Sequence, residues 1–526
     1  MKNLHRSLVI GCSALALAGC GADEIVSPGT GGNVTINNPA PTPAPAPAPT
    51  PTSTLATPAA SCPQIANPTQ LLDLGTISGP TGTYRRCRLP ESFTASSTLP
   101  RVAGTLYELN GQTDVGVDQG FGSTNTAVTL DIEPGVIIFA SGNDFLNVNR
   151  GNKLNAVGTA AKPIIFTSRQ NVEGSTSTDT SGQWGGIILS GRAPVVDCFI
   201  GSEAAGTCER RVEGATNQIL YGGAQSNDSS GTLSYIQIRF SGFALANGDE
   251  LQSLTTGGVG SGTVINNIQS YNSSDDGAEF FGGSVRASRL AIIGAEDDSL
   301  DTDTGLKGLF DQVLIVQRPA ASDTVIEQDS DGNEEASPRT NVRVNNATMI
   351  AQSSIGDRGI RVRGSSDFSL FNSLVWDRLG TNNGCINVQG VSVDRAAGAN
   401  DESGPVVFNS VALQCATNFR GGSGSTAAQV EARFDAGAAN TKAFTNTLAR
   451  LTGITTGAPF INGSAENTYN PIFDANAVSS FFPTGRSYIG AVPSEAANWA
   501  EGWTCNSATV TLGLNNTGSC DTLPQI

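Results

Sequence analysis

The sequence predicts an all-β solenoid, a parallel β-helix with a cap at each end. Its 62 glycines occur among many Asn and Ser residues, and no stretch shows useful helical periodicity. Short β-forming runs recur between these turn formers, at residues 136–139, 164–167, 186–189 and 314–316. Residues 275–280 align with residues 297–302, and Ile268 then aligns with Leu290, 22 residues on. A repeat of about this length corresponds to one coil of a parallel β-helix.

Residues 1–20 have the features of an export signal. Lys2 and Arg6 precede an apolar run, residues 8–18, that is too short to span a bilayer. The run ends in Leu17-Ala18-Gly19-Cys20, which resembles the lipobox of bacterial lipoproteins. That resemblance implies that Cys20 becomes the acylated first residue, with a lipid such as palmitate. The alternative is an ordinary secretory signal that happens to end near a cysteine.

Residues 21–61 are expected to form a disordered linker. The alternating Pro, Ala and Thr of residues 39–51 cannot build a core and favour polyproline II. Twenty such residues at about 3.1 Å each would hold a domain roughly 60 Å from the lipid. In some bacteria an Asp next to the lipidated cysteine marks retention in the inner membrane. Here Gly21 follows Cys20, which favours the outer membrane and leaves the membrane face open.

The remaining chain is expected to comprise an N-terminal capping region at 62–125, a β-helix at 126–495 and a C-terminal cap at 496–526. A coil buries its inward residues only against its neighbours, so both ends need covering. We expect Trp499 and Trp503 to plug the C-terminal end, whereas Trp184 and Trp376 are candidates for stacking on sugars.

Charge and histidine content exclude several classes of function. Without residues 1–20, the chain has 28 basic and 47 acidic residues, a net charge of −19. Such a field repels nucleic acids and attracts cations. His5 is the only histidine and leaves with the export signal, which excludes Ser-His-Asp catalysis and histidine-ligated zinc.

Eight cysteines follow the export segment as four sequential couples. An oxidising compartment favours disulfides, and the tight spacing of a metal cluster is absent. Many connectivities are open to eight cysteines, but a solenoid places sequence neighbours close together, so nearest-neighbour pairing is the simplest. The expected pairs are Cys62 with Cys87, Cys198 with Cys208, Cys385 with Cys415, and Cys505 with Cys520.

Several motifs resemble those of a known class of proteins. They are LDIEPGV (130–136), LNAVGT (154–159), PIIFTS (163–168), WGGIIL (184–189), residues 257–263, DDGAEFFGG (275–283), YIGAV (488–492), Trp499 and GWT (502–504). Over about 126–505 the chain is similar to bacterial outer-membrane or secreted lipoproteins with a right-handed parallel β-helix, of the pectate-lyase-like class. The resemblance implies the architecture and no particular reaction.

An acidic ladder is the best candidate for a functional site. The 22-residue period stacks Asp275 on Asp297, Asp276 on Asp298 and Glu279 on Asp301 at the strand spacing. Two bare carboxylates at that distance repel by about 3.5 kcal/mol at an effective dielectric near 20. Oxygen-only ligands suit Ca²⁺. The predicted ligands are Asp275, Asp276, Glu279, Asp297, Asp298, Asp301 and Asp303, with Glu250 and Asp311 as additions. Solvated turn residues are the alternative.

Two further segments have weaker signals. Residues 327–335 place alternating carboxylates and a glycine as an EF-hand-like loop does, but Pro338 occupies the twelfth position, so a solvated insertion is favoured. Residues 257–263 are rich in glycine but lack the lysine and helix of a phosphate-binding loop, which favours a turn between coils.

Arg361, Arg363 and Lys307 are the candidate catalytic residues. In β-helix polysaccharide lyases an Arg or Lys acts as base beside Ca²⁺, although salt bridges to the many acids are the simpler expectation for Arg361 and Arg363. The acidic segments also suggest polygalacturonases, whose aspartates act across a sugar bond. Those enzymes carry a histidine that this chain lacks after residue 20.

The sequence therefore predicts a lipid-anchored, calcium-stabilised β-helix at the bacterial outer membrane. Its expected role is non-catalytic binding or scaffolding, with a glycan or an outer-membrane protein as partner and no nucleic acid. The alternative is a calcium-dependent polysaccharide lyase or a glycoside hydrolase of the same fold.

Overall fold

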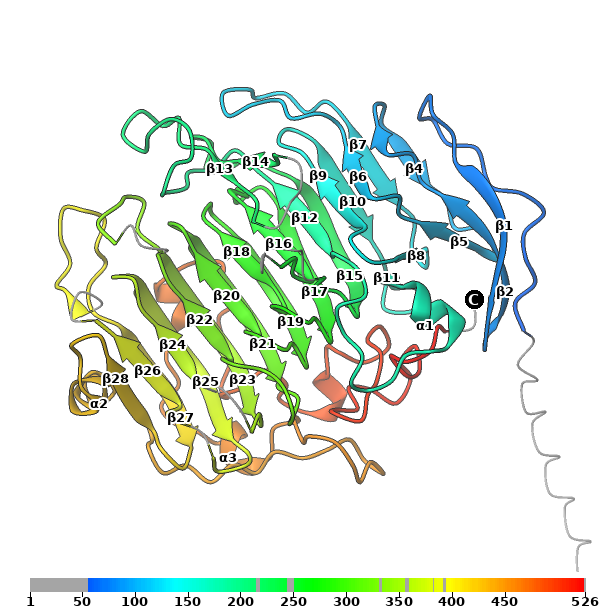
Figure 1. The fold of residues 1–526 in the computed structure, drawn as a ribbon. Coiled ribbons are helices and arrows are strands. Elements are labelled where there is room, and N and C mark those ends of the chain that lie inside the picture. Colours follow the sequence, from blue (N-terminus) through cyan, green and yellow to red (C-terminus); the bar gives the residue numbers. More distant parts are fainter. Residues whose placement is uncertain are drawn as a thin grey trace, which may run out of the picture. The chain divides into compact units, whose positions relative to one another are not determined.

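The computed structural model describes residues 55–213, 218–243, 250–330, 334–354, 359–381, 383–390 and 394–524 (Figure 1). All of them belong to one compact unit, Ser53–Ile526. The predicted export signal, Cys20 and nearly all of the linker lie outside the described residues. None of the helices in the described ranges is long and apolar enough to cross a membrane.

Two large sheets form the body of this unit, and both run along the stack of coils (Figure 1). Sheet A has 15 strands: β1 (Leu72–Gly79), β2 (Gly82–Arg88), β4 (Ser97–Leu99), β5 (Thr105–Glu108), β7 (Thr129–Ile132), β8 (Ile137–Ala140), β10 (Lys153–Val157), β11 (Ile164–Ser168), β15 (Gly231–Arg239), β17 (Val264–Tyr271), β19 (Arg286–Ile293), β21 (Lys307–Val316), β23 (Asn341–Ala351), β25 (Asp367–Asp377) and β27 (Val407–Gln414).

Sheet B is the second sheet, with 11 strands: β3 (Ser92–Phe93), β6 (Gln112–Val115), β9 (Phe145–Val148), β12 (Ile187–Ser190), β16 (Leu254–Gly257), β18 (Glu279–Phe281), β20 (Leu300–Asp303), β22 (Ile326–Gln328), β24 (Ile360–Val362), β26 (Ile386–Gln389) and β28 (Phe419–Gly422). The remaining elements are the hairpin β13 (Arg210–Arg211) and β14 (Leu220–Tyr221), the helices α1 (Arg169–Glu173), α2 (Ala427–Ala436) and α3 (Ser464–Asn467), and the 3-10 turns η2 (Ala475–Ala477) and η3 (Glu495–Ala497).

Parallel pairing between successive coils confirms the predicted all-β parallel β-helix. Ile268 on β17 pairs with Leu290 on β19, as the 22-residue period predicts. Alternate residues of each strand face inward. The apolar inward residues, such as Phe280, Leu300, Ile326 and Ile360 of sheet B, form one continuous core cluster with those of sheet A.

The long strands of sheet A are bent at one residue each. In the early coils β10 and β11 are separate strands, and both pair with β15, which joins the two directions in one strand. From β15 onward, a residue with left-handed backbone geometry, φ between 50° and 57°, marks the bend. These residues are Tyr235, Asn267, Arg289, Gln312, Asn346, Asn372 and Ser410. Each coil contributes one such residue, and the bend residues of neighbouring strands lie opposite one another. The bends therefore stack, and each coil turns at the same place.

The boundaries predicted for the β-helix need correction at both ends. Parallel pairing already begins where β2 meets β5, well before residue 126. The last paired strand, β28, ends at Gly422 and not near residue 495. The amphipathic helix α2 covers this end, where Phe434 packs against Phe408 and Phe419 at ring-centroid distances of 5.6 and 5.2 Å.

Residues 438–524 form a C-terminal strap that runs back over the outer face of sheet A. Thr441 bridges to Ala412 on β27, and the Asn346 amide on β23 donates to the Tyr488 carbonyl at 3.0 Å. Farther along, Gln269 on β17 exchanges two hydrogen bonds with the backbone of Cys505, at 3.0 and 2.8 Å. Leu523 ends the strap in a cluster with Ile77 and Tyr84 of the first two strands.

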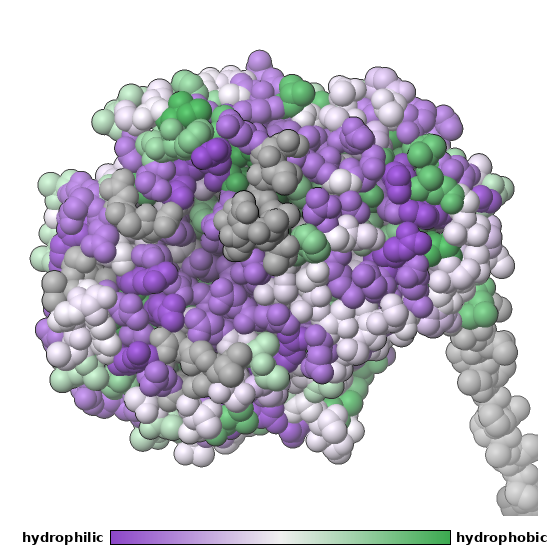
Figure 2. Space-filling view, in the orientation of Figure 1, coloured by the Kyte–Doolittle hydropathy of each residue, from purple (hydrophilic) through white to green (hydrophobic). Residues whose placement is uncertain are grey.

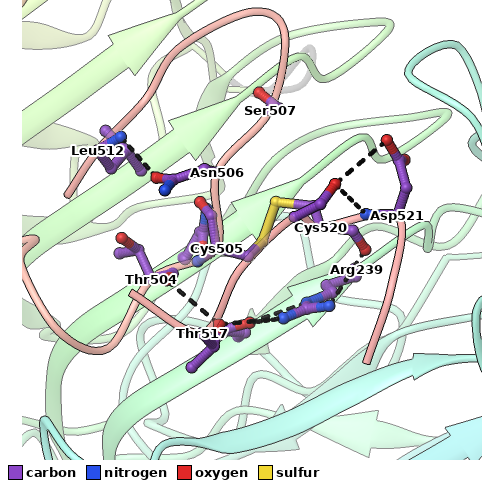
Figure 3. The surroundings of a disulfide bond; sticks show 12 residues. Arg239, Thr504, Cys505, Asn506, Ser507, Leu512, Thr517, Cys520 and Asp521 are labelled. Atoms are coloured by element: carbon purple, nitrogen blue, oxygen red, sulfur yellow. Dashed lines mark hydrogen bonds between the residues drawn. A yellow bond between two sulfur atoms is a disulfide. The ribbon is translucent and has the colours of Figure 1, made fainter. Parts of the chain in front are cut away.

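Trp499 and Trp503 belong to this strap, so the prediction that they plug the C-terminal end is wrong. Their rings stack at 6.5 Å, and Trp503 lies edge-on against Tyr235, the bend residue of β15. The same region of the strap holds the buried Arg239, whose guanidinium donates to the carbonyls of Cys520 and Thr522 at 3.1 and 3.0 Å (Figure 3). The sequence could not reveal this reversal, because apolar strap residues look the same whether they cover an end or a sheet.

The structure contains the four nearest-neighbour disulfides, which confirms the predicted pairing. Cα–Cα distances are 5.6 Å for Cys62–Cys87, 5.0 Å for Cys198–Cys208, 6.2 Å for Cys385–Cys415 and 4.9 Å for Cys505–Cys520. All four lie in the range that disulfide geometry requires.

Candidate functional site

A row of charged side chains crosses the outer face of sheet B. Glu279 on β18 pairs in register with Asp301 on β20, Asp301 with Glu327 on β22, and Glu327 with Arg361 on β24. Their inward neighbours belong to the core, so the charged residues all point outward. We call Glu279, Asp301 and Glu327, with the turn residues Asp275, Asp276, Asp297 and Asp298, the carboxylate row.

The turns before β18 and β20 bring the aspartates of adjacent coils together. The Asp298 backbone amide donates to Asp276 Oδ1 at 2.9 Å, and the Gly277 amide donates to the Asp298 carbonyl at 3.0 Å. The Thr324 amide of the next turn donates to Asp298 Oδ1 at 2.6 Å. These contacts agree with the predicted stacking of Asp276 on Asp298.

The carboxylate row faces outward, yet four of its members, Asp276, Glu279, Asp298 and Glu327, are buried, whereas Asp297 is exposed. Asp276, Glu279 and Asp298 are each only 6% exposed, which turn residues in open solvent would not be. The insertion that carries β13 and β14 covers part of this face, because Tyr221 packs on Phe281 with ring centroids 6.1 Å apart. Hydrophilic residues dominate the surface over β20, β22 and β24 (Figure 2).

Three overlapping triads of carboxylates have oxygen atoms within 4.8 Å of one another. They are Asp275, Asp276 and Asp297; Asp276, Glu279 and Asp301; and Asp297, Asp298 and Asp323. Glu279 Oε2 is buried and has no hydrogen-bond partner among the described residues. An unpartnered buried oxygen in a group of carboxylates is the feature that a bound cation would satisfy.

Burial and mutual repulsion raise the pKa values of six carboxyl groups in the row: Asp275, Asp276, Glu279, Asp297, Asp298 and Asp301. The pKa of Asp275 rises to about 7, by burial first and then by the charges of Glu250 and Asp297. The pKa of Asp301 rises to about 8, by burial and by the charge of Glu327. Burial also raises the pKa values of Asp276, Glu279 and Asp298 well above their ordinary range. Near neutral pH the row therefore needs either protons or a cation.

The other predicted ligands divide into two groups. Glu250 lies near the row, since its pKa is raised by burial and by the charges of Asp297 and Glu296. Asp303 follows on β20 and accepts from the Thr304 amide at 2.5 Å. The prediction of Asp311 as an additional ligand is wrong, because Asp311 lies on β21 of sheet A, where Arg486 donates to its two oxygens at 2.6 and 2.8 Å. Asp323 is the ligand candidate that the sequence did not reveal, because it lies outside the aligned repeat.

The candidate catalytic cations are all held by carboxylates. Arg361 contacts Glu327 at 2.7 Å and Asp323 at 3.4 Å. Arg363 contacts Glu327 at 2.6 Å and Asp329 at 2.8 Å. These distances confirm the expectation of salt bridges for both arginines.

Lys307 lies apart from the carboxylate row, at the start of β21, and contacts Asp401 at 2.6 Å. Burial lowers the pKa of Lys307, while Asp401 opposes that shift. The structure therefore separates this lysine from the two arginines with which the sequence grouped it.

The described start of the segment 327–335 differs from that of an EF-hand-like loop. Glu327 lies in strand β22 and is 5% exposed, so the segment does not begin as a solvated insertion either. Its positions 331–333 lie outside the described residues. Residues 257–263 form the predicted turn, between β16 and β17. Trp184 is fully buried against Phe166, and Trp376 packs against the strap, so neither is an open sugar platform.

The fold and this site define a parallel β-helix protein with a buried carboxylate row on one outer face. The family model of the pectate-lyase-like β-helix domain matches residues 101–504, and the chain belongs to that family. A comparison with curated proteins found no match, and neither did a comparison with solved structures.

Proposed function

We propose that this protein is a lipid-anchored, non-catalytic binding protein of the bacterial outer membrane, on a β-helix stabilised by Ca²⁺. Cys20 would carry the lipid, and the partner would be a glycan or an outer-membrane protein. The membrane face and the identity of the partner are open within this proposal.

The arrangement of the carboxylate row supports calcium. Ca²⁺ takes six to eight oxygen ligands in flexible geometry, and the row offers only oxygen. Asp276, Glu279 and Asp301 would hold the ion most directly, since their oxygens lie within 4.8 Å and Glu279 Oε2 lacks a partner. Asp297, Asp298 and Asp323 would hold a second ion, with Asp275, Asp303 and Glu250 nearby.

The ion pairs of Arg361 and Arg363 are the observation that favours a non-catalytic role. A general base must be unprotonated before it can accept a proton from the substrate. A carboxylate partner stabilises the protonated guanidinium and so opposes this role. Both arginines share Glu327 as a partner. Their charge therefore neutralises the end of the carboxylate row and orders the coils there.

A calcium-dependent polysaccharide lyase is the second candidate, with a glycoside hydrolase as its variant. One observation favours it: Arg361 lies in register directly after Glu327, at the end of the carboxylate row. A substrate carboxylate that displaced Glu327 from Arg361 would place the guanidinium beside both substrate and metal.

A glycan array read for both binding and cleavage separates the two candidates. We expect retention of one glycan class with no shortening of the chain and no unsaturated product. The Arg361→Gln variant should retain that glycan. If the unmutated protein releases unsaturated oligosaccharides and the Arg361→Gln variant does not, the protein is a lyase and the binding role is wrong.

A further inference from the structure

The insertion that carries β13 and β14 has a rigid tip with two exposed apolar side chains. Phe199 and Ile200 are 48% and 45% exposed, and Figure 2 shows hydrophobic surface beside β13. The Cys198–Cys208 disulfide closes this tip. The amides of Phe199 and Ile200 both donate to the Glu209 carbonyl, at 2.8 and 3.1 Å. Because the tip is already ordered, it would lose little conformational entropy on binding a partner.

A buried arginine fixes the insertion to the body of the β-helix. Arg150, just after β9, is 1% exposed and contacts Glu209 at 2.6 Å. Arg150 also contacts Asp118 at 2.5 Å and donates to the Gly222 carbonyl at 3.1 Å. The insertion is therefore held at two points, and its tip is presented at a fixed position.

The tip also carries an unpaired positive charge. The guanidinium of Arg211 on β13 lies over the Phe199 ring, with its central carbon 3.7 Å from the ring centroid. The neighbouring Arg210 pairs with Asp197 at 2.5 Å. Arg211 is exposed, and among the residues that the structure describes its side chain makes no ion pair or hydrogen bond. We call Phe199, Ile200 and Arg211 the insertion tip.

A cleft of about 580 Å³ adjoins the same disulfide, since Cys208 is one of its lining residues. A volume of this size is typical of sites that enclose a ligand or the anchoring side chains of a partner. The apolar residues that line it come from the base of the insertion and from two later loops: Pro194, Val195, Ala224, Pro338 and Ala399. The cleft can therefore accept apolar side chains.

Two carboxylates border the cleft, and one of them lacks a cation. Asp401 contacts Lys307 at 2.6 Å. Glu203 Oε1 accepts from the Asp197 amide at 3.1 Å, and in the described ranges no cation pairs with Glu203. Glu203 and Arg211 lie on one insertion without contacting each other. The cleft and the insertion tip thus carry opposite unpaired charges.

We propose that two copies of this chain form a dimer in which the insertion tip of each copy enters the cleft of the other. A two-fold dimer uses the same patch on both copies, so the patch must hold both the projecting group and its receptor. The shared Cys198–Cys208 disulfide places them side by side. Phe199 and Ile200 bury apolar surface in the cleft, which stabilises the dimer.

The charges set the register of this dimer. Arg211 of one copy pairs with Glu203 of the other, and the same contact recurs across the two-fold axis. Complementary charges favour this partner over an apolar surface that lacks them. The dimer goes beyond the binding role proposed above and depends neither on calcium nor on the lipid.

Sedimentation equilibrium of the full chain tests the dimer, in the Cys20→Ser background so that a lipid cannot cause micelles. We expect the mass to approach that of two chains with rising concentration and to increase no further. Phe199→Ser and Arg211→Glu, each in this background, should dimerise at least tenfold more weakly. The matched control Leu514→Ser removes an apolar side chain that is 57% exposed on the strap, and it should dimerise as the parent chain does.

Charge reversal identifies the pair. Glu203→Arg alone should weaken the dimer as Arg211→Glu does, because each change sets like charges against each other. The two changes in one chain should restore most of the lost affinity, since both contacts are re-formed with their signs exchanged. If melting shows that Glu203→Arg is misfolded, Phe199→Ser and Arg211→Glu decide the question, because both side chains are exposed.

A monomer at every concentration would overturn the dimer, and assemblies that grow beyond two copies would overturn its two-fold symmetry. An equal loss in Leu514→Ser, unchanged affinity in Phe199→Ser, or no recovery in a folded double reversal would also overturn it. Each of these results leaves the calcium and lipid proposals untouched, since neither enters the measurement.

Discussion

Asp276 and Asp298 meet through the main chain: the Asp298 amide donates to the Asp276 carboxylate at 2.9 Å. This backbone donor binds one oxygen of Asp276. Asp276 belongs to two of the carboxylate triads, and Asp298 belongs to the third. The stacking of coils thus sets up adjacent groups of carboxylates that share members. A cation in one group would lower the repulsion felt by the next.

Calcium should raise the melting temperature of the protein. Ca²⁺ that binds only the folded state adds about 2.7 kcal/mol to the free energy of unfolding at a hundredfold excess over its dissociation constant. The variant Asp276→Asn with Asp298→Asn should lose most of the shift and keep its fold, since it also removes repulsion. Calorimetry with calcium and with chelator measures both effects.

The control for this change is Glu91→Gln, at an exposed carboxylate just before β3, five strands away from β18 in sheet B. It should retain the whole calcium shift. An unshifted melting temperature in the unmutated protein, after verified removal of calcium, would contradict the metal site.

Metal-free protein should become less stable as the pH rises toward 8. The folded pKa values of Asp275, about 7, and Asp301, about 8, lie above their unfolded values near 4. The folded state therefore holds more protons than the unfolded state between these limits, and the free energy of unfolding falls with rising pH. Melting temperatures in chelator from pH 5 to pH 9 measure the slope.

The variant Asp301→Asn should show a shallower slope, because it removes one of the raised carboxyl groups. Calcium should oppose the fall, since it replaces the protons. A melting temperature in chelator that increases between pH 6 and pH 8 would refute this account of the row.

Loss of the Cys505–Cys520 disulfide should destabilise the strap. This bond closes a loop with a sequence separation of 15, which contributes about 3 kcal/mol in the loop-entropy model. The variant Cys505→Ser with Cys520→Ser should lower the free energy of unfolding by about that amount in denaturant titrations. Hydrogen exchange should increase first at Gln237 and Gln269, which bind the strap.

Non-reducing peptide mapping of the unmutated protein is the companion measurement. It should yield the four nearest-neighbour pairs. Free thiols at Cys505 and Cys520, or a crosslink to a distant cysteine, would be inconsistent with the structure.

The substitution Cys20→Ser should release the protein from the membrane fraction. The run Leu17-Ala18-Gly19-Cys20 resembles a lipobox, so the anchor is expected to be a lipid on Cys20. Fractionation at high salt, followed by immunoblotting, measures the distribution. Persistent sedimentation of the variant with outer membranes would exclude the lipoprotein proposal.

Local repeats explain why much of the fold could be predicted from the sequence. Residues 275–280 and 297–302 preserve their pattern because each coil buries its inward residues against the next, and Glu279 does pair with Asp301. The cysteine couples were predictable for the same reason. The carboxylate row follows directly from this register.

The bends of sheet A and the path of the strap could not be predicted in the same way. Tyr235, Arg289 and Gln312 adopt left-handed backbone geometry that glycine or asparagine usually signals. The contact between Gln237 and Trp503 joins residues 266 positions apart, which no local period can reveal. Asp323 escaped notice because its turn does not repeat the paired aspartates.

The strap also constrains when the molecule can finish folding. Leu523, Ile77 and Tyr84 share one cluster, so the packing of the first strands depends on strap residues that are synthesised after all the coils. A chain made from its N-terminus onward leaves its early coils incompletely covered until the end of the strap arrives. For the lipoprotein that we propose, the strap would have to cross the inner membrane before the first strands complete their packing.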